Sequence, residues 1–263
     1  SGASMGANSV LSPLGIPMIS YASTSPALSD SEAYPTFWRV VPSDALQGQA
    51  LAAAVTAGSS PAVLYMANDY ATGLANAFNN SWAGAGEGLC SAGMISYDPA
   101  SFDGAAIASQ IVSAGCDSVV LASYAADGTQ LISDLNTAGF TGAIYGGDGV
   151  ADSAFPGPDG MVATRPSAGS GTPSERAQAF AGLCAGVAEC AGGIYTGETF
   201  DAFIVMGYSI FAQAGTPEIP LTSMVQAVGQ GFVGATGDIT FMANGDVPGS
   251  GYCVGTFDAG AFT

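Results

Sequence analysis

Short apolar runs alternate with amphipathic stretches through the middle of the chain. Four runs have the length and composition of buried strands, at 61–67, 89–97, 118–122 and 142–145. Apolar residues recur at helical spacing between these runs: Leu74, Ala77, Phe78 and Trp82, then Ala105, Ile107, Ala108, Ile111 and Val112, then Leu131, Ile132 and Leu135. Strands that alternate with helices of this length predict a parallel, doubly wound α/β sheet.

The two ends of the chain follow other patterns. Residues 1–21 indicate a helix followed by a strand at 17–21, which would lie at a sheet edge or beside strands that this chain lacks. Residues 172–175 have the form of a capping box with proline at the first helical position. Two strand-like runs at 237–242 and 251–257 flank the turn Asn244-Gly245-Asp246. One side of a long helix is predicted to carry Phe200, Phe203, Ile204, Gly207, Ile210 and Phe211.

The charge and the missing residue types exclude several classes of function. There are 21 acidic residues against three arginines, with no lysine and no histidine, so the formal charge is −18. This charge repels phosphate backbones and anionic membranes, so no nucleic-acid partner is expected. Without histidine there is no Ser-His-Asp triad or HExxH zinc site, and without lysine no Walker A loop or Schiff base. The sequence indicates no metal site, no cofactor and no enzymatic activity.

Five cysteines point to disulfides and an oxidising compartment. They form no CxxC motif and no metal-like cluster. Cys184 and Cys190 bracket a short Gly-containing loop and are predicted to pair. Cys90 and Cys116 each precede a strand of the same predicted sheet and are a second possible pair, while the odd count leaves one cysteine over. No apolar run is long enough to cross a bilayer, so no direct membrane insertion is expected.

Several motifs occur in a recognisable order along nearly the whole chain. Residues 1–4 (SGAS) open a helix, and 16–28 (IPMISYASTSPAL), 37–44 (FWRVVPSD), 68–74 (NDYATGL) and 234–246 (GATGDITFMANGD) follow. Taken together they resemble the branched-chain amino-acid-binding proteins (the Leu/Ile/Val-binding family) of the type I periplasmic binding family, the extracytoplasmic receptors of ABC importers. Members of this family carry three more β-α units before this point, so the chain resembles a member that lacks the start of lobe 1.

The resemblance implies a fold, a domain organisation and a partner. The fold would be type I periplasmic-binding-protein-like, with two doubly wound α/β lobes joined by three crossovers near 41–44, 162–166 and 241–247. Lobe 1 would consist of 1–43 and 165–246, and lobe 2 of 44–164 and 247–263. The protein would be periplasmic or extracellular, secreted or lipid-anchored through a part outside this sequence, and would deliver its ligand to ABC transporter membrane subunits.

The same resemblance implies the residues of a site for a small amino acid, branched-chain or aliphatic. A helix N-terminus suits a carboxylate, and by family position Ser1 and Thr24 would bind it, with Ala22 (through its carbonyl) and Ser23 beside them. Asp148 would accept from the ammonium, and Tyr70 and Tyr124 would wall off the side chain. Asp148 is shorter than the family's glutamate. The ordinary roles for these residues are a helix cap, turn residues and half-buried packing.

Two other functions compete with this reading. The same fold serves receptors, so the chain could be a ligand-sensing domain for amino acids or amides. Paired carboxylates catalyse acid–base reactions without histidine, and Asp148, Asp152 and Asp159 are near one another in sequence. Their Gly/Pro-rich segment has no spacing that fixes their mutual geometry.

Overall fold

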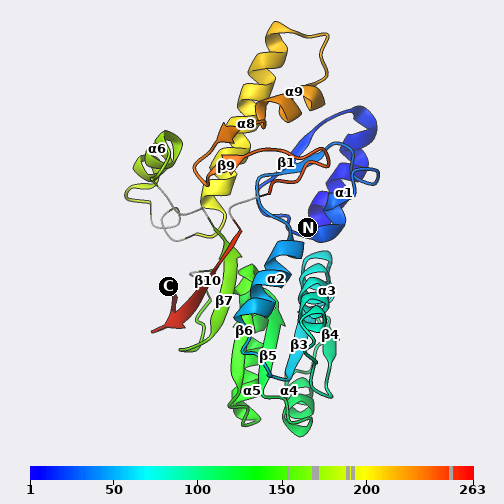
Figure 1. Ribbon diagram of the computed structural model, residues 1–263, viewed down its shortest axis with the longest axis vertical. Coiled ribbons are helices and arrows are strands. Elements are labelled where there is room, and N and C mark those ends of the chain that lie inside the picture. Colours follow the sequence, from blue (N-terminus) through cyan, green and yellow to red (C-terminus); the bar gives the residue numbers. More distant parts are fainter. Residues whose placement is uncertain (153–154, 168–171, 188–189, 191–192, 249–250) are drawn as a thin grey trace. The chain divides into compact units, whose positions relative to one another are not determined.

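The chain folds as two compact units. The computed structural model describes residues 1–152, 155–167, 172–187, 190, 193–248 and 251–263 (Figure 1). Unit 1 consists of Ser1–Ser43 and Pro166–Gly251, and unit 2 of Asp44–Arg165 and Tyr252–Thr263. The chain therefore passes from one unit to the other three times. That the units act as the two lobes of a binding protein stays a prediction.

Unit 2 is built on a seven-stranded sheet in the order β11-β10-β7-β6-β5-β3-β4. The strands from β4 to β7 pair in parallel, and β10 pairs antiparallel with β11. The strands are β3 (Pro61–Met66), β4 (Met94–Tyr97), β5 (Ser118–Ala122), β6 (Ala143–Gly146), β7 (Val162–Pro166), β10 (Tyr252–Asp258) and β11 (Ala261–Phe262). The predicted doubly wound sheet is confirmed.

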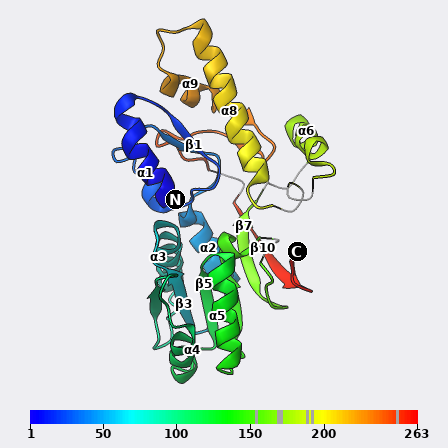
Figure 2. The ribbon, with the colours of Figure 1, turned by 180° about the vertical axis from the view of Figure 1, so that it is seen from behind.

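Helices cover both faces of this sheet. Helix α2 lies in front of the sheet in Figure 1 and α5 lies in front of it in Figure 2. Because both faces are covered, the central strands are apolar and buried along nearly their whole length. The helices are α2 (Asp44–Ala54), α3 (Asp69–Gly84), α4 (Gly104–Ser113) and α5 (Ala125–Thr137), with the short 3-10 helix η3 at Asp148–Val150.

The strand order places a topological switch point between β3 and β5. After β3 the chain goes outward to β4 and then returns past β3 to β5. In open α/β sheets, ligands bind at the carboxyl ends of the strands beside such a point. The residues that follow β3 and β5 are therefore the first place to look for a site.

The contact between α2 and α3 depends on the absence of a side chain at Gly48. A Cβ added there would lie 2.5 Å from the Ala77 carbonyl carbon and 2.6 Å from the Phe78 nitrogen. We expect Gly48→Ala to lower the free energy of unfolding by about 1–3 kcal/mol through overpacking, despite a helix-propensity gain of about 1 kcal/mol. Urea unfolding measures this.

The matched control is Gly6→Ala in the exposed helix α1 (Gly2–Leu11), where an added Cβ meets nothing within 4 Å. This variant should keep or gain stability. Equal gains for Gly6→Ala and Gly48→Ala would contradict the close approach of α2 and α3.

Two disulfides are present, one in each unit. Cys184 pairs with Cys190, with their Cα atoms 5.2 Å apart, as predicted. Cys90 pairs with Cys116 across a sequence separation of 26, which confirms the second possible pair. Cys253 is the remaining free cysteine. Strand β4 begins later than the predicted strand 89–97. The Cys90 amide donates to Pro61 O outside the β4 ladder, and a turn at Gly93, whose φ is 65°, separates Cys90 from the strand.

Unit 1 holds smaller sheets. Strand β1 (Met18–Ser20) pairs in parallel with β2 (Phe37–Arg39), and β8 (Phe232–Val233) pairs antiparallel with β9 (Asp238–Ile239). Its helices are α1 (Gly2–Leu11), α6 (Glu175–Cys184), α8 (Thr196–Gly215) and α9 (Leu221–Val228), with 3-10 turns η1 (Ser12–Leu14) and η2 (Pro26–Ser29). Its core contains Trp38, Val40, Ala202, Val205, Val225, Phe232, Ile239, Phe241 and Val247.

Three expectations about unit 1 need correction. Lobe 2 was expected to resume at residue 247, but Val247 is buried in the core of unit 1, and unit 1 extends to Gly251. The cap of α6 is Ser174, whose hydroxyl accepts from the Ala177 amide, so the capping box does not begin at Thr172. The buried face of α8 carries Asp201, Ala202, Val205 and Ser209, while Phe203 and Phe211 are exposed.

None of the helices in the described part of the chain combines the length and apolar character that a bilayer-spanning segment needs.

Candidate functional site

Two of the predicted ligand residues lie on either side of the switch point in unit 2. Tyr70 is in the first turn of α3, just after β3, and Tyr124 is the N-cap of α5, just after β5. Their rings stack with centroids 5.3 Å apart and an interplanar angle of 20°. Tyr70 is buried, whereas Tyr124 is 45% exposed. The pair therefore presents one partly open aromatic face at the carboxyl edge of the sheet.

Asp148 joins this pair. It follows β6 and is 3% exposed. The Tyr70 hydroxyl donates to Asp148 Oδ1 at 2.6 Å and accepts from the Gly149 amide at 3.0 Å. We call Tyr70, Tyr124 and Asp148 the tyrosine–aspartate cluster. The structure thus brings together all three residues predicted for this half of the site.

Burial controls the electrostatics of the cluster. Loss of solvation raises the pKa of the Asp148 carboxyl, and hydrogen bonds from Tyr70 and Gln47 only partly oppose it. Burial, followed by the charges of Asp148 and Asp44, raises the pKa of Tyr70 well above its usual range. A buried carboxylate with a raised pKa gains from a cationic partner, because the cation replaces the lost solvation.

Asp148 lies between two glycines, Gly147 and Gly149, and neighbouring atoms leave no space for a side chain at either position. A Cβ on Gly147 would lie 2.9 Å from the Tyr70 hydroxyl, and a Cβ on Gly149 would lie 3.1 Å from it. The Gly-rich segment therefore lets the backbone carry Asp148 against Tyr70. The turn role considered for Asp148 from the sequence is also present, since its carbonyl accepts from Ala151.

The other predicted residues gather in unit 1. The Ser25 amide donates to Ser1 Oγ at 3.1 Å, and the Ser4 and Ser23 hydroxyls are 2.7 Å apart. The amides of Ala22 and Ser23 both donate to Ser20 Oγ. We call Ala22, Ser23, Thr24 and Ser25 the 22–25 loop. Ser1 is the N-cap residue of α1 but makes no side-chain cap hydrogen bond, so its hydroxyl serves this loop instead of the helix.

Thr24 is the unusual member of the 22–25 loop. It is fully buried, and its Oγ1 has no hydrogen-bond partner among the described residues. An unpaired buried hydroxyl costs about 1–3 kcal/mol, so this position carries a polar atom that the fold itself does not use.

Sequence reasoning missed Gln47, which belongs with the tyrosine–aspartate cluster. It lies in α2, is fully buried, and donates through Nε2 to the Thr164 carbonyl and hydroxyl at 3.1 Å. Its hydrogen bond to Asp148 lowers the pKa of that carboxyl. The available signal was a glutamine four positions before the core residue Leu51, on the buried face of α2.

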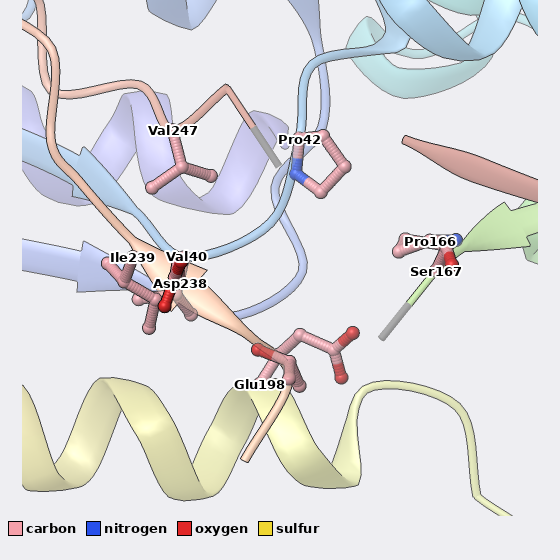
Figure 3. A pocket seen from close by; sticks show the side chains of 9 residues that line it. Val40, Pro42, Pro166, Ser167, Glu198, Asp238, Ile239 and Val247 are labelled. Atoms are coloured by element: carbon pink, nitrogen blue, oxygen red, sulfur yellow. The ribbon is translucent and has the colours of Figure 1, made fainter. Parts of the chain in front are cut away.

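Two cavities in the described residues lie apart from the tyrosine–aspartate cluster. One in unit 1 has a volume of about 10 Å³, room for a single water molecule. Figure 3 shows Glu198 extending from α8 toward Ser167 in this cavity. A cavity of about 270 Å³ in unit 2 is lined by Asn136, by residues 140–144 at the start of β6 and by residues 158–161 just before β7, so it lies at the amino ends of these strands, opposite Asp148.

The described residues contain no cluster suited to a metal ion, and two of the three acids weighed for acid–base catalysis lie apart. No group of three or more His, Cys, Asp or Glu side chains there could hold a metal ion. Asp159 lines the cavity at the amino ends of the strands, whereas Asp148 follows the carboxyl end of β6. These two acids therefore do not form the pair that acid–base catalysis would need.

Solved structures of other proteins share the fold of this chain. The chain is 21% identical to the leucine-binding protein LivK from Thermotoga maritima, with a TM-score of 0.83 over 97% of this chain and 74% of that one. It is 22% identical to an ABC transporter substrate-binding protein from Desulfitobacterium hafniense in complex with Leu, with a TM-score of 0.77 over 99% and 76% of the two chains. Both show that the fold is that of type I periplasmic binding proteins.

Sequence comparison supplies the family. Over 42 residues the chain is 60% identical to metabotropic glutamate receptor 8 of Homo sapiens, a stretch that covers 16% of this chain and only 5% of the receptor. Residues 1–152 match the family model described as receptor family ligand binding region, the ANF receptor family. Because this match covers more than half of the chain, the protein belongs to the ANF receptor family of ligand-binding regions.

Proposed function

We propose that this chain is the ligand-binding part of an extracytoplasmic solute-binding protein that takes a small aliphatic amino acid and performs no chemistry on it. The observation that carries the proposal is Asp148, an almost completely buried carboxylate with a raised pKa beside the stacked tyrosines. An α-ammonium is the cation that such a carboxylate would accept. The tyrosine–aspartate cluster then holds the ammonium and covers the aliphatic side chain.

The ligand carboxylate is assigned to unit 1. Thr24 Oγ1 is a buried hydroxyl with no protein partner, which suits a ligand oxygen. Ser1, Ala22 and Ser23 lie beside it in one hydrogen-bonded group. In the proposal, the two units close on the ligand through the three crossovers, because a ligand that contacts both stabilises the closed state by its differential contacts.

The charges favour a neutral side chain on the ligand. A second carboxylate, as in glutamate, is bound most strongly by a cationic partner, and the sequence contains three cationic side chains. All three have other contacts: Arg39 with Asp246, Arg165 over the Phe262 ring, and Arg176 over the Phe232 ring. Leucine or isoleucine is therefore a better candidate than glutamate.

A receptor domain that senses amino acids is the second candidate. It is favoured by the 42-residue identity with a metabotropic glutamate receptor. The two candidates share the amino-acid site and differ in partner: ABC transporter membrane subunits for an importer, and a signalling domain for a receptor. Both place the chain in the periplasm or outside the cell, where the two disulfides are stable.

Calorimetry with matched ligands tests the proposal. L-leucine should bind with a dissociation constant in the micromolar range or lower. 4-Methylpentanoate, which lacks the ammonium, and 3-methylbutylamine, which lacks the carboxylate, should each bind far more weakly. L-glutamate should be rejected. Equal binding of leucine and 4-methylpentanoate would overturn the role of Asp148, and preference for glutamate would overturn the aliphatic specificity.

Thr24→Val should change stability and binding in opposite directions. Valine fills the same space without the unpaired hydroxyl, so the free energy of unfolding should rise, by at most about 1–3 kcal/mol. Leucine binding should weaken by about 1–3 kcal/mol, because one hydrogen bond to a charged group is lost. Thermal unfolding and calorimetry measure the two effects. A variant that is less stable than the parent and binds leucine equally well would show that the hydroxyl serves the fold.

A further inference from the structure

Arg39 is the largest fully buried polar side chain of the protein's described part. It is 0% exposed and ends strand β2. Removing a guanidinium from water costs several kcal/mol unless its hydrogen bonds are satisfied. Its position in the core therefore requires an arrangement of acceptors that matches the planar fork of an arginine.

The acceptors come from two segments far apart in sequence. Nε donates to Asp246 Oδ1 at 2.7 Å, in a buried ion pair. Nη1 donates to Ser23 O at 3.1 Å and to Ser25 O at 3.0 Å. Nη2 donates to Ser29 Oγ at 2.8 Å. One side chain thus joins the 22–25 loop to the turn at 244–246.

Two of these bonds bracket Thr24. The carbonyls of Ser23 and Ser25, one residue before it and one after it, both point at Nη1. Because a trans peptide is planar, holding the Ser23 carbonyl toward the guanidinium directs the Thr24 amide the opposite way. The orientation of Thr24 therefore depends on Arg39, although the two side chains share no hydrogen bond in the described contacts.

The turn at 244–246, on the other side of Arg39, is also held by hydrogen bonds. The Arg39 amide donates to Gly245 O at 3.0 Å. Asn244 Nδ2 donates to Asp246 Oδ2 at 3.0 Å and to Ser29 O at 3.1 Å. This turn lies just before the chain leaves unit 1 for the last time, after Gly251.

We propose that Arg39 is a positioning residue for ligand binding: with Asp246 it fixes the 22–25 loop so that Thr24 faces the ligand, and it ties this loop to the turn at 244–246. The inference rests on the proposed function and deepens it, because Arg39 acts through Thr24 and touches no ligand itself.

The test compares Arg39→Lys and Asp246→Asn with the parent chain and with Arg176→Lys. Arg176 is the matched control because it also donates to a backbone carbonyl, Val233 O, but lies outside this network. Lysine keeps the charge of Arg39 without the fork, so it cannot hold both carbonyls and Ser29. Affinity for L-leucine by calorimetry and amide hydrogen exchange by mass spectrometry are the readouts.

We expect Arg39→Lys to weaken leucine binding about tenfold to a hundredfold, equal to about 1.4–2.7 kcal/mol. Amide exchange should rise at least tenfold in 22–29 and stay unchanged in β3 and β5. Asp246→Asn should show the same pattern more weakly, and Arg176→Lys should keep the parent affinity. If Arg39 served only the fold, Arg39→Lys would lower the free energy of unfolding and leave the leucine affinity of the folded protein unchanged.

Three outcomes separate the inference from the proposed function. Parent-like affinity and exchange in folded Arg39→Lys would overturn the inference alone. If Arg39→Lys does not fold, Asp246→Asn decides in the same way. Failure of the parent chain to bind leucine would overturn the proposed function, and the exchange data, which need no ligand, would then decide whether Arg39 orders the 22–25 loop.

Discussion

Asp148→Ala is expected to weaken leucine binding by about 2–5 kcal/mol, or about 30-fold to 5,000-fold. The ammonium would be desolvated without its charged partner, and Tyr70 would lose the acceptor of its 2.6 Å hydrogen bond. Calorimetry at neutral pH measures the loss. Asp148→Asn separates the charge from the shape of the side chain, because it keeps an oxygen for the Tyr70 hydroxyl. A similar loss for both variants would assign the effect to charge.

The pH dependence of binding gives a second view of the same carboxylate. Burial raises the pKa of Asp148 in the free protein, and a bound ammonium favours the ionised form and lowers that pKa. Affinity should therefore be constant at high pH and fall as the pH drops through the raised pKa, starting above the ordinary value of about 3.9. The fall should be absent in Asp148→Asn. An affinity that is flat down to about pH 4 in the parent would contradict the ammonium role.

Stability should respond in the opposite direction. A folded-state pKa that is raised means that the fold prefers the neutral carboxyl, so this stabilising contribution is lost as the pH rises through the raised pKa. Asp148→Asn, which is neutral at every pH, should therefore match or exceed the parent's stability at pH 8. Asp201→Asn is the contrasting case: burial raises the pKa of Asp201 too, but both Asp201 oxygens accept short hydrogen bonds from Ala235 and Thr236, and an amide nitrogen cannot accept them. Asp201→Asn should therefore lower the free energy of unfolding.

The sequence was sufficient for the parts of the fold where one physical signal dominates. The runs at 61–67 and 118–122 became β3 and β5, because a strand covered by helices on both faces is apolar along its whole length. The alternation with helices was then enough for a parallel sheet. The order β4-β3-β5, which creates the switch point, came only from the structure.

The errors arose where a local pattern competed with tertiary contacts. The apolar positions of α8 at 203, 207, 210 and 211 form a regular stripe, yet the buried face carries Asp201 because the amides of Ala235 and Thr236 need its carboxylate. Ser174 is the α6 cap although Thr172 has the better sequence context, since the Ser174 hydroxyl also donates to Gly234 O at 2.7 Å. Neither contact is visible in a local window.

The candidate site was predicted only as far as the motifs reached. Tyr70, Tyr124 and Asp148 converge as expected, because each follows a parallel strand of one sheet. Gln47 and Arg39 were not recognised as parts of the site, because they act through other residues: Gln47 through Asp148 and Arg39 through the 22–25 loop. Supporting residues of this kind are defined by three-dimensional contacts, and the only hint along the chain is the polar Gln47 four positions before the core residue Leu51.

Replacing both Cys90 and Cys116 by alanine is expected to lower the free energy of unfolding by about 3.5 kcal/mol. The disulfide closes a loop of sequence separation 26, and the stabilisation comes mainly from the chain entropy that this loop removes from the unfolded state. The corresponding change at Cys184 and Cys190, with a separation of 6, should cost about 2 kcal/mol. Urea unfolding without reductant measures both, and Cys253→Ser, which breaks no disulfide, is the control.

The Cys90–Cys116 variant should bind leucine almost as the parent does. The loop that it releases contains the edge strand β4 and helix α4, whereas Tyr70 follows β3, which stays paired with β5 on its other side. Leucine affinity should therefore change by less than tenfold while amide exchange in β4 increases. A loss of binding as large as that of Asp148→Ala would mean that β4 helps to hold the tyrosine–aspartate cluster, and equal destabilisation by the two disulfide variants would contradict the dependence on loop length.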